Sequence, residues 1–244
     1  MGIEGLNVEA INSKVSRYWS VSVIEETTST QSDLVQQFKS GKVLVAEYQS
    51  AGRGRLDRKF IVPPRKGLTF SFCVEATNDF GWIPLLTGLA VAQGINSYLN
   101  SDLVKIKWPN DLLIDEKRLG GILSEKSETG VVVGVGINIF QTQTELPISD
   151  ATSLTNVVRN MEIDRSELLS RILDRIGEVL ADLGKFKNEY REFCSTIGKS
   201  VMVTLPTGQV IEDLAIGIST EGALLLKSHE ITVGDTVHLR NIDK

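Results

Sequence analysis

The sequence predicts an α+β fold, with a large domain over residues 1–195 and a small all-β domain over residues 196–244. At 244 residues the chain is long enough for one medium domain and a small one. Helical and strand-like segments are mixed before Cys194. After it the chain consists of short strand-like runs, separated by Pro206, Gly208, Gly222 and Gly234.

The first half of the large domain is expected to contain two helices and two strands. These are a short helix capped by Ser29 or Thr30 and ended by Gly41, strands over residues 42–48 and 68–74, and a helix over residues 83–99 with Pro84 in its first turn. The two strands therefore flank a long connecting segment.

The second half continues with strands and ends in a long helix. Short strands are expected over residues 105–108 and 112–114, then over 119–125, and residues 131–140 are apolar on both faces, as in a strand covered on both sides. Asp164 is suited to cap the longest helix, whose apolar residues recur every three or four positions as far as Leu183.

Positive charge is concentrated in the segment between the first two strands. The chain has 26 Lys and Arg against 31 Asp and Glu, a net charge of −5. Residues 52–67 contain six basic residues and one acidic residue, Asp57, so this segment carries +5 and the other 228 residues carry −10. The acidic total disfavours wholesale binding of a nucleic-acid backbone. The local reversal predicts a site for a small anion. It also predicts a loop that is mobile without ligand, because its unpaired like charges repel one another and its glycines resist ordering.

The glycines of this segment support an anion site without defining a known nucleotide motif. Gly52-Arg53-Gly54 follows a strand, but Asp57 stands where a dinucleotide fingerprint has its third glycine, and no P-loop pattern occurs in the chain. Glycines that admit close backbone approach, with arginines between them, suit a phosphate or a carboxylate. A solvated basic loop is the alternative interpretation.

Three further motifs bear on chemistry. Lys107-Trp-Pro-Asn-Asp111 places a cation and a carboxylate at the ends of a stiff connector, which suits phosphate binding and amine activation but also a plain turn with an ion pair. Arg118-Leu-Gly-Gly-Ile-Leu123 and Gly134-Val-Gly-Ile-Asn138 have paired glycines within strand patterns. Such glycines mark bulges, tight packing or a ligand against the backbone.

Together these motifs resemble the biotin protein ligase family. The matching segments are Ser29-Thr-Gln31, Gln49 with Ala51-Gly-Arg-Gly-Arg55, Lys107–Asp111, Arg118–Leu123 and Gly134–Asn138. The resemblance implies a mixed-sheet domain like that of class II aminoacyl-tRNA synthetases, with helices on one side, and a C-terminal SH3-like β-barrel. It also implies two reaction steps: biotin and ATP give biotinyl-5′-AMP and pyrophosphate, and a lysine of a biotin carboxyl carrier protein then takes the biotin. Mg²⁺ accompanies ATP.

The resemblance carries roles to individual residues. Biotin would be bound by Ser29, Thr30, Gln31, Gln49, Arg53, Gly54, Arg55, Arg118 and Gly121. ATP or the adenylate would be bound by Arg53, Arg55, Phe60, Lys107, Arg118 and Asn138. The catalytic residues would be Arg55, Lys107, Arg118 and Asp111, the last orienting or deprotonating the carrier lysine. The chain departs from the usual family pattern at Gln31, Asp57, Phe60 and Arg118.

Several other features limit the expected partners and location. Cys73 and Cys194 are far apart and the two histidines have no second-ligand pattern, so no metal site is expected and a reducing cytoplasm suits the chain. No apolar run reaches the length of a membrane span. About 17 residues precede the first family-like strand, so DNA binding is not expected. For partners, a homodimer stays open. For function, the alternative is a lipoate- or octanoate-handling transferase of the same fold.

Overall fold

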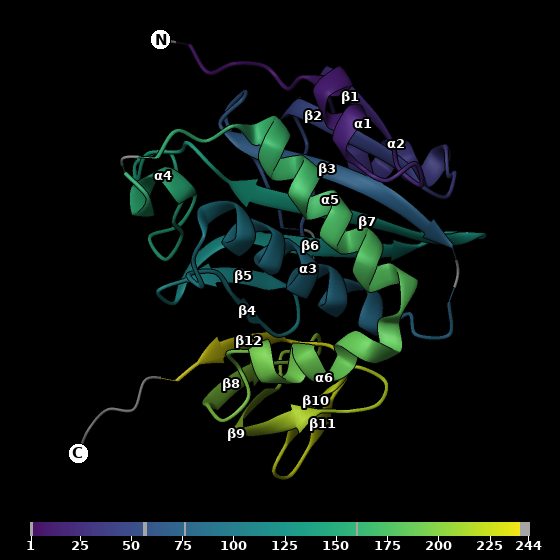
Figure 1. Ribbon diagram of the computed structural model, residues 1–244. Helices are drawn as coiled ribbons and strands as arrows, with labels where there is room; N and C mark the ends of the chain where they lie inside the picture. The colour runs from purple at the N-terminus through teal and green to yellow at the C-terminus, as the bar shows by residue number, and fades with distance from the viewer. Residues whose placement is uncertain (1, 56–57, 76, 160, 240–244) are drawn as a thin grey trace.

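The computed structural model describes residues 2–55, 58–75, 77–159 and 161–239, so Asp57 lies outside the described residues. Its main element is a seven-stranded sheet in the order β1-β2-β3-β7-β6-β5-β4, in which only β1 and β2 are parallel (Figure 1). The strands are β1 Ser20–Thr27, β2 Lys42–Gln49, β3 Gly67–Glu75, β4 Lys105–Lys107, β5 Asp111–Ile114, β6 Lys117–Lys126 and β7 Gly130–Asn138. The expectation of a mixed sheet is confirmed.

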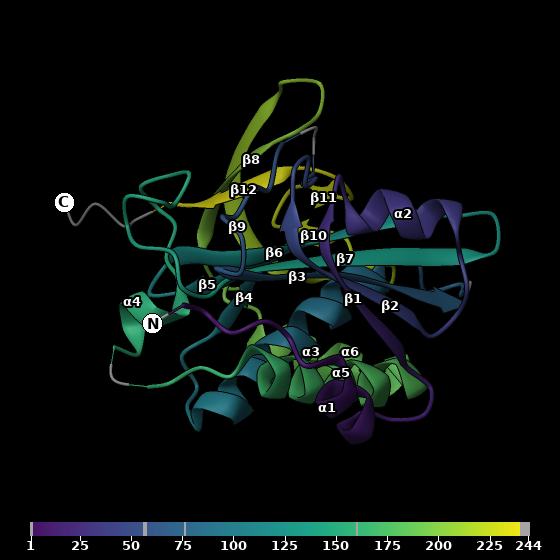
Figure 2. The ribbon, with the colours of Figure 1, turned by 90° about the horizontal axis from the view of Figure 1, so that it is seen from above.

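Helices cover both faces of this sheet. They are α1 Val8–Lys14, α2 Thr30–Gln36, α3 Trp82–Leu99, α4 Leu154–Val157, α5 Arg165–Ala181 and α6 Leu183–Phe193. Figure 2 shows α1, α3 and α5 on one face and α2 on the other. The expectation of helices on one side is therefore wrong for α2. Within the described ranges, no helix is long and apolar enough to cross a membrane.

Alternation along the central strands explains the two covered faces. On one side Leu34 of α2 packs with Leu44, Cys73 and Val132. The residues next to them along the strands point the opposite way, into the core with α3 and α5. Helices α3 and α5 cross closely at Gly94, where a Cβ atom would lie 2.9 Å from the Cα of Ile172.

Two helix ends differ from the expected ones. Ser29, rather than Thr30, caps α2 and accepts a hydrogen bond from the Ser32 N–H. The helix ends at Gln36, and Gly41 instead makes the turn into β2 with φ of 77°. The long helix that starts after Asp164 breaks at Asp182. The side chain of Asp182 caps α6 by accepting from the Lys185 N–H, a competing signal within the apolar pattern.

The C-terminal strands form a second, smaller sheet beside the β4 edge of the first (Figure 1). They are β8 Ser200–Thr204, β9 Val210–Ile218, β10 Leu224–Leu226, β11 Glu230–Ile231 and β12 Asp235–His238, in the order β11-β10-β9-β8-β12. Up to Leu239, where the described chain ends, no strand pairing joins β11 to β12, so the sheet is open and a closed barrel is not observed.

Candidate active site

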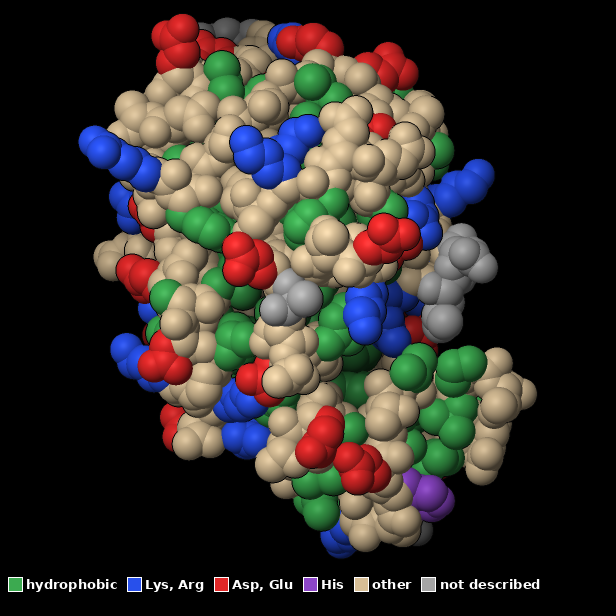
Figure 3. Space-filling model, turned by 90° about the vertical axis from the view of Figure 1, so that its right-hand side faces the viewer, with side chains coloured by type: hydrophobic (Ala, Val, Ile, Leu, Met, Phe, Trp, Pro, Cys, Tyr) green, Lys and Arg blue, Asp and Glu red, His purple; other side chains and the backbone are tan. Residues whose placement is uncertain are grey.

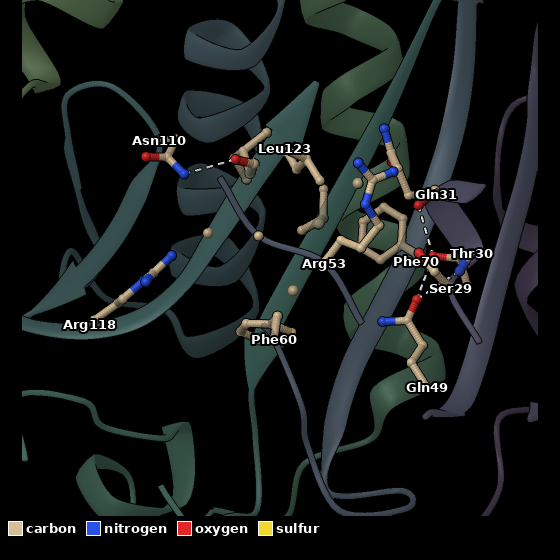
Figure 4. A pocket seen from close by; sticks show the side chains of 17 residues that line it. Ser29, Thr30, Gln31, Gln49, Arg53, Phe60, Phe70, Asn110, Arg118 and Leu123 are labelled. Carbon is tan, nitrogen blue, oxygen red and sulfur yellow. Dashed lines mark hydrogen bonds between the residues drawn. The ribbon is translucent and has the colours of Figure 1, made fainter. Parts of the chain in front are cut away.

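A small cavity lies where α2 meets the middle of the main sheet and the basic loop crosses it. The space between its walls, counted with the open solvent at its mouth, is about 440 Å³. Its walls come from α2 and its cap, from β2, β3, β6 and β7, and from the loop, as Figure 4 shows for ten labelled side chains. The predicted site residues that line it are Ser29, Thr30, Gln31, Gln49, Arg53, Gly54, Phe60, Arg118 and Gly121.

One end of this cavity is a buried polar cluster. Gln49 Oε1 accepts from the backbone N–H of Thr30 at 2.7 Å and from its hydroxyl at 3.1 Å. The Thr30 hydroxyl also lies 2.8 Å from that of Ser71, which is fully buried. Gln31 donates from Nε2 to the Val132 carbonyl, but its Oε1 has no partner in the described chain. A buried acceptor without a partner is costly unless a ligand satisfies it.

Glycines leave room for this cavity, which explains their presence within strands. A Cβ atom on Gly134 would lie 2.7 Å from Gln31 Oε1, and one on Gly136 would lie 2.4 Å from the Phe60 ring. A Cβ on Gly121 would lie 2.6 Å from the Arg118 guanidinium. At these three positions, the interpretation of strand glycines as places of close approach is confirmed.

A second, larger cleft opens beside the first, between the two sheets. Gly54, Phe60, Asn110 and Arg118 line both spaces. The cleft is also lined by Arg55, Arg58, Lys107 and Asp111, and on its far side by Lys199, Asp235 and His238 of the C-terminal part. Figure 3 shows Lys and Arg side chains beside a hollow above the smaller lobe.

The ends of the Lys107–Asp111 motif meet in this cleft. The two residues face each other across the β4–β5 turn, and Lys107 Nζ lies 3.4 Å from the Asp111 carboxylate. Arg118 Nε lies 3.1 Å from the other oxygen of that carboxylate. All three side chains are more than two-thirds buried. One carboxylate thus holds two cations at the boundary between the cavities.

Four of the six cations of the basic loop have acidic partners. Arg53 pairs with Glu125 on β6 at 2.9 Å and Arg65 with Glu25 on β1 at 3.0 Å. Arg58 pairs with Asp235 on β12, and Lys66 with Glu145. The premise that the like charges of this loop are unpaired is therefore wrong for these four residues, because the fold brings carboxylates to them. The mobility of the loop stays a prediction.

Besides Lys107 and Asp111, two more predicted residues do not line the small cavity. Arg55 lines only the larger cleft and donates to the Asn110 side chain at 3.2 Å; its burial lowers the pKa of the guanidinium. Asn138 lines neither space. Its buried amide donates to the Thr152 carbonyl and accepts from Gln141, so the geometry does not offer it to a nucleobase.

Some lining residues were not assigned a role from the sequence. Ser71 lines the small cavity, and Glu125, which pairs with Arg53 beside it, does not; both come from strands whose pattern carries no local signal of a site. Asn110 lies within the Lys107–Asp111 motif. Its side chain donates a hydrogen bond to the Ile122 carbonyl and accepts one from the Arg55 guanidinium. The far wall of the cleft comes from the C-terminal strands, and only the tertiary structure places them there.

The fold and the paired cavities define an α+β ligand-binding domain. The profile of the biotin/lipoate A/B protein ligase family matches residues 21–139. The chain is 34% identical to a biotin–[acetyl-CoA-carboxylase] ligase of Mycobacterium tuberculosis, over 92% of this chain and 91% of that protein. It is 28% identical to the bifunctional ligase/repressor BirA of Escherichia coli, over 91% of this chain and 74% of BirA.

Solved structures agree with these relatives. A biotin protein ligase from Aquifex aeolicus in complex with biotin and ATP superposes with a TM-score of 0.79 and 31% identity, covering 90% of this chain and 98% of that one. The apo structure of that ligase gives a TM-score of 0.77 over 91% of this chain and 100% of that one, at 27% identity. The chain belongs to the biotin/lipoate A/B protein ligase family.

Proposed function

We propose that the protein is an ATP-dependent biotin protein ligase, which forms biotinyl-5′-AMP and transfers biotin to a lysine of a carrier protein. The relatives named above are ligases of this kind. The observation that carries the proposal to this chain is the small cavity. It has a buried polar end, an apolar middle and cations where it opens into the larger cleft.

The polar end suits the cyclic urea of biotin. Gln31 Oε1 offers an acceptor without a protein partner, and it can accept from a ureido N–H. Gln49 Oε1 accepts from Thr30, so the Nε2 donor of the same amide stays available to a ligand. The ureido carbonyl of biotin is a suitable acceptor for it. The walls at Phe70, Leu123 and Val135 supply apolar surface for the ring and the valeryl chain.

The cations between the two spaces address the main electrostatic obstacle of the first step. A carboxylate must approach the α-phosphate of ATP, and both are anions. Lys107 and Arg118 lie together at that boundary, held by Asp111, so they can neutralise both groups without reorganising. Arg53 and Arg55 approach from the loop, and Phe60 offers a ring that both spaces share. ATP would bring Mg²⁺ as part of the substrate.

In the second step a lysine amine attacks the mixed anhydride and AMP leaves. Asp111 is the carboxylate nearest this boundary, and we assign to it the orientation of the incoming ammonium and the acceptance of its proton. The larger cleft is open enough to admit a lysine side chain from a biotin carboxyl carrier protein. We place the reaction in the cytoplasm, which suits two buried free thiols.

We also propose that residues 196–244 form a distinct domain of the SH3-like type. In support, β8 to β11 follow one another as neighbours and β12 returns to pair with β8, as in a five-stranded barrel. This domain would close the larger cleft from the side opposite the basic loop.

The test is biotin-dependent exchange of labelled pyrophosphate into ATP, followed by transfer of labelled biotin to a purified carrier domain. We expect exchange with biotin and transfer to the carrier lysine. Absence of exchange with biotin contradicts the proposal. Exchange with lipoate or octanoate instead identifies a different acyl ligase of the same fold.

A further inference from the structure

A chain of hydrogen bonds connects the C-terminal sheet to the Lys107–Asp111 motif. Glu116, in the turn between β5 and β6, lies with its Oε2 2.9 Å from Nδ1 of His238 on β12. Nε2 of His238 lies 3.1 Å from the Thr196 hydroxyl. That hydroxyl accepts the backbone N–H of Trp108 at 3.0 Å. Four groups from three distant parts of the sequence thus form one continuous series.

This series contains the residue types of a catalytic triad, but its hydroxyl is not exposed to a substrate. A carboxylate, an imidazole and a hydroxyl in line can activate the hydroxyl as a nucleophile. Thr196 is fully buried, does not line either cavity, and already accepts a backbone N–H. The series therefore ends on the backbone of Trp108, where it can fix a position but cannot reach a substrate.

The hydrogen positions follow from the partners. Nδ1 of His238 lies 2.9 Å from the Glu116 carboxylate and 3.3 Å from Lys199 Nζ, and because the shorter contact is to an acceptor we assign a hydrogen to Nδ1. In the neutral ring Nε2 is then an acceptor, and the Thr196 hydroxyl donates to it while accepting from Trp108. Lys199 completes the arrangement by donating to Glu116 at 2.6 Å.

The segment that contains Thr196 also contacts strand β4. The N–H and the hydroxyl of Ser195 both donate to the Ile106 carbonyl at 2.8 Å, and Cys194 forms a parallel bridge with Ile106. Residues 194–196 thus extend the main sheet beyond β4. Trp108 follows Lys107 at the start of the turn that returns to Asp111, so its N–H lies in the backbone that joins the two charged residues.

We propose that Glu116, His238 and Thr196 are positioning residues that hold Lys107 and Asp111 in register for the ligase reaction. This inference rests on the proposed function. It gives the C-terminal sheet a part in the reaction that is separate from lining the cleft.

The positioning should depend on pH. Burial lowers the pKa of the His238 imidazole, Lys199 before β8 and Lys107 on β4 act in the same direction, and Glu116 opposes them. As pH falls through this pKa, Nε2 gains a proton and stops accepting from Thr196. The hydroxyl must then turn: its oxygen accepts from Nε2 as well as from Trp108, and its own hydrogen loses its acceptor, so the series is weakened on the acid side.

Thr196→Val removes the hydroxyl with little change of volume, and Thr196→Ser restores it. We expect Thr196→Val to lower kcat for pyrophosphate exchange about tenfold, because a buried N–H loses its acceptor, with the KM for biotin unchanged. Thr196→Ser should recover most of this loss. Thr87→Val is the matched control, since the buried Thr87 hydroxyl has no partner in the described chain.

His238→Gln tests whether protonation of the imidazole causes the pH dependence. The amide oxygen of glutamine can accept from Thr196 at every pH tested, so we expect the acid limb of the kcat profile to flatten between about pH 5 and about pH 8. His229→Gln, at the other and exposed histidine, should leave the profile unchanged. Equal kcat values for Thr196→Val and the wild type, or an acid limb that survives His238→Gln, would overturn the inference.

Two measurements that need no catalysis test the hydrogen-bond series independently of the proposed function. We expect the Trp108 amide to exchange with solvent about tenfold faster in Thr196→Val than in the wild type or Thr87→Val, and nitrogen NMR to show hydrogen on Nδ1 of His238 at neutral pH. Equal exchange rates contradict the hydrogen-bond series. If the wild type shows no biotin-dependent exchange of pyrophosphate, the proposed function fails, and these two measurements still decide the series.

Discussion

At the scale of single residues, the polar end of the small cavity is defined by what is left unpaired. Thr30, Gln49 and Ser71 satisfy one another, which fixes the orientation of each side chain. Gln31 is held through its nitrogen alone, so its oxygen is available to a ligand. The Gln31 side chain lines the cavity.

Replacing Gln31 should therefore affect binding more than folding. We expect Gln31→Met to raise the KM for biotin about tenfold, the value of one hydrogen bond to a buried acceptor, while the KM for ATP stays the same. The free energy of unfolding should change by less than about 1 kcal/mol, because the variant also removes an unpaired buried oxygen.

Gln36→Met, at an exposed position of the same helix, is the matched control and should change none of these quantities. Steady-state exchange kinetics and urea unfolding provide the measurements. A biotin KM that does not respond to Gln31→Met would remove Gln31 from the site.

At the scale of elements, the basic loop is attached to three different parts of the fold. Arg53 is bound to β6, Arg65 to β1 and Arg58 to β12. The Arg55 guanidinium also approaches the Gly234 carbonyl at 3.5 Å. The loop and the C-terminal sheet are therefore linked across the mouth of the larger cleft, where an incoming phosphate would compete with Asp235 for Arg58.

Asp235→Asn tests this link. The pair is partly exposed, so the interaction is modest, and we expect amide exchange at residues 53–54 and 58–60 to rise by no more than about fivefold without ligands. Biotin and ATP together should make the exchange rates of Asp235→Asn and the wild type equal, because the phosphates then bind the loop cations.

Glu230→Gln, at an exposed position on β11, serves as the control for a general effect on the small sheet. Loop exchange rates that are the same in Asp235→Asn and the wild type would show that Asp235 does not restrain the loop.

At the scale of the whole molecule, one buried ion pair joins the segments that carry the site. Arg165, at the start of α5, pairs with Glu47 on β2 at 2.6 Å, and both side chains are nearly inaccessible. Arg165 also donates to the carbonyls of Gly67 and Glu4, and Glu47 accepts the Leu6 N–H. The pair thus fixes both stems of the basic loop and the N-terminal segment against α5.

Breaking this pair should destabilise the entire fold. We expect Glu47→Gln to lower the free energy of unfolding by about 3 kcal/mol or more, because it leaves a buried guanidinium without its counter-charge. Glu47→Met combined with Arg165→Met should recover part of that loss, since no buried charge remains.

Urea unfolding at neutral pH measures both effects. Glu167→Gln, which breaks partly exposed pairs with Arg171 on the same helix and with Lys14 on α1, should have a much smaller effect. A Glu47→Gln variant as stable as the wild type would show that the pair does not join these segments energetically.

Local pattern was sufficient for much of the fold. Strands such as Lys42–Gln49 and Gly67–Glu75 are built of β-forming residues, and the helix at Trp82–Leu99 is long and apolar with its proline in the first turn. The pattern failed where two signals competed, as at Asp182, where a capping side chain interrupts an apolar repeat. It also could not assign α2 to the opposite face, because that depends on which side of the sheet remains uncovered.

The sequence by itself determined which chemical groups are present: the Gly-Arg loop, the Lys107–Asp111 motif and the paired strand glycines, whose residue types and order carry the family resemblance. Only the tertiary structure decided their partners. It paired the loop cations with carboxylates from β1, β6 and β12, occupied Asn138 with Thr152 and Gln141, and brought His238 to Thr196. The physical reason is range: conformational preference and periodicity act over a few residues, whereas hydrogen bonds and ion pairs join groups that only the folded chain brings together.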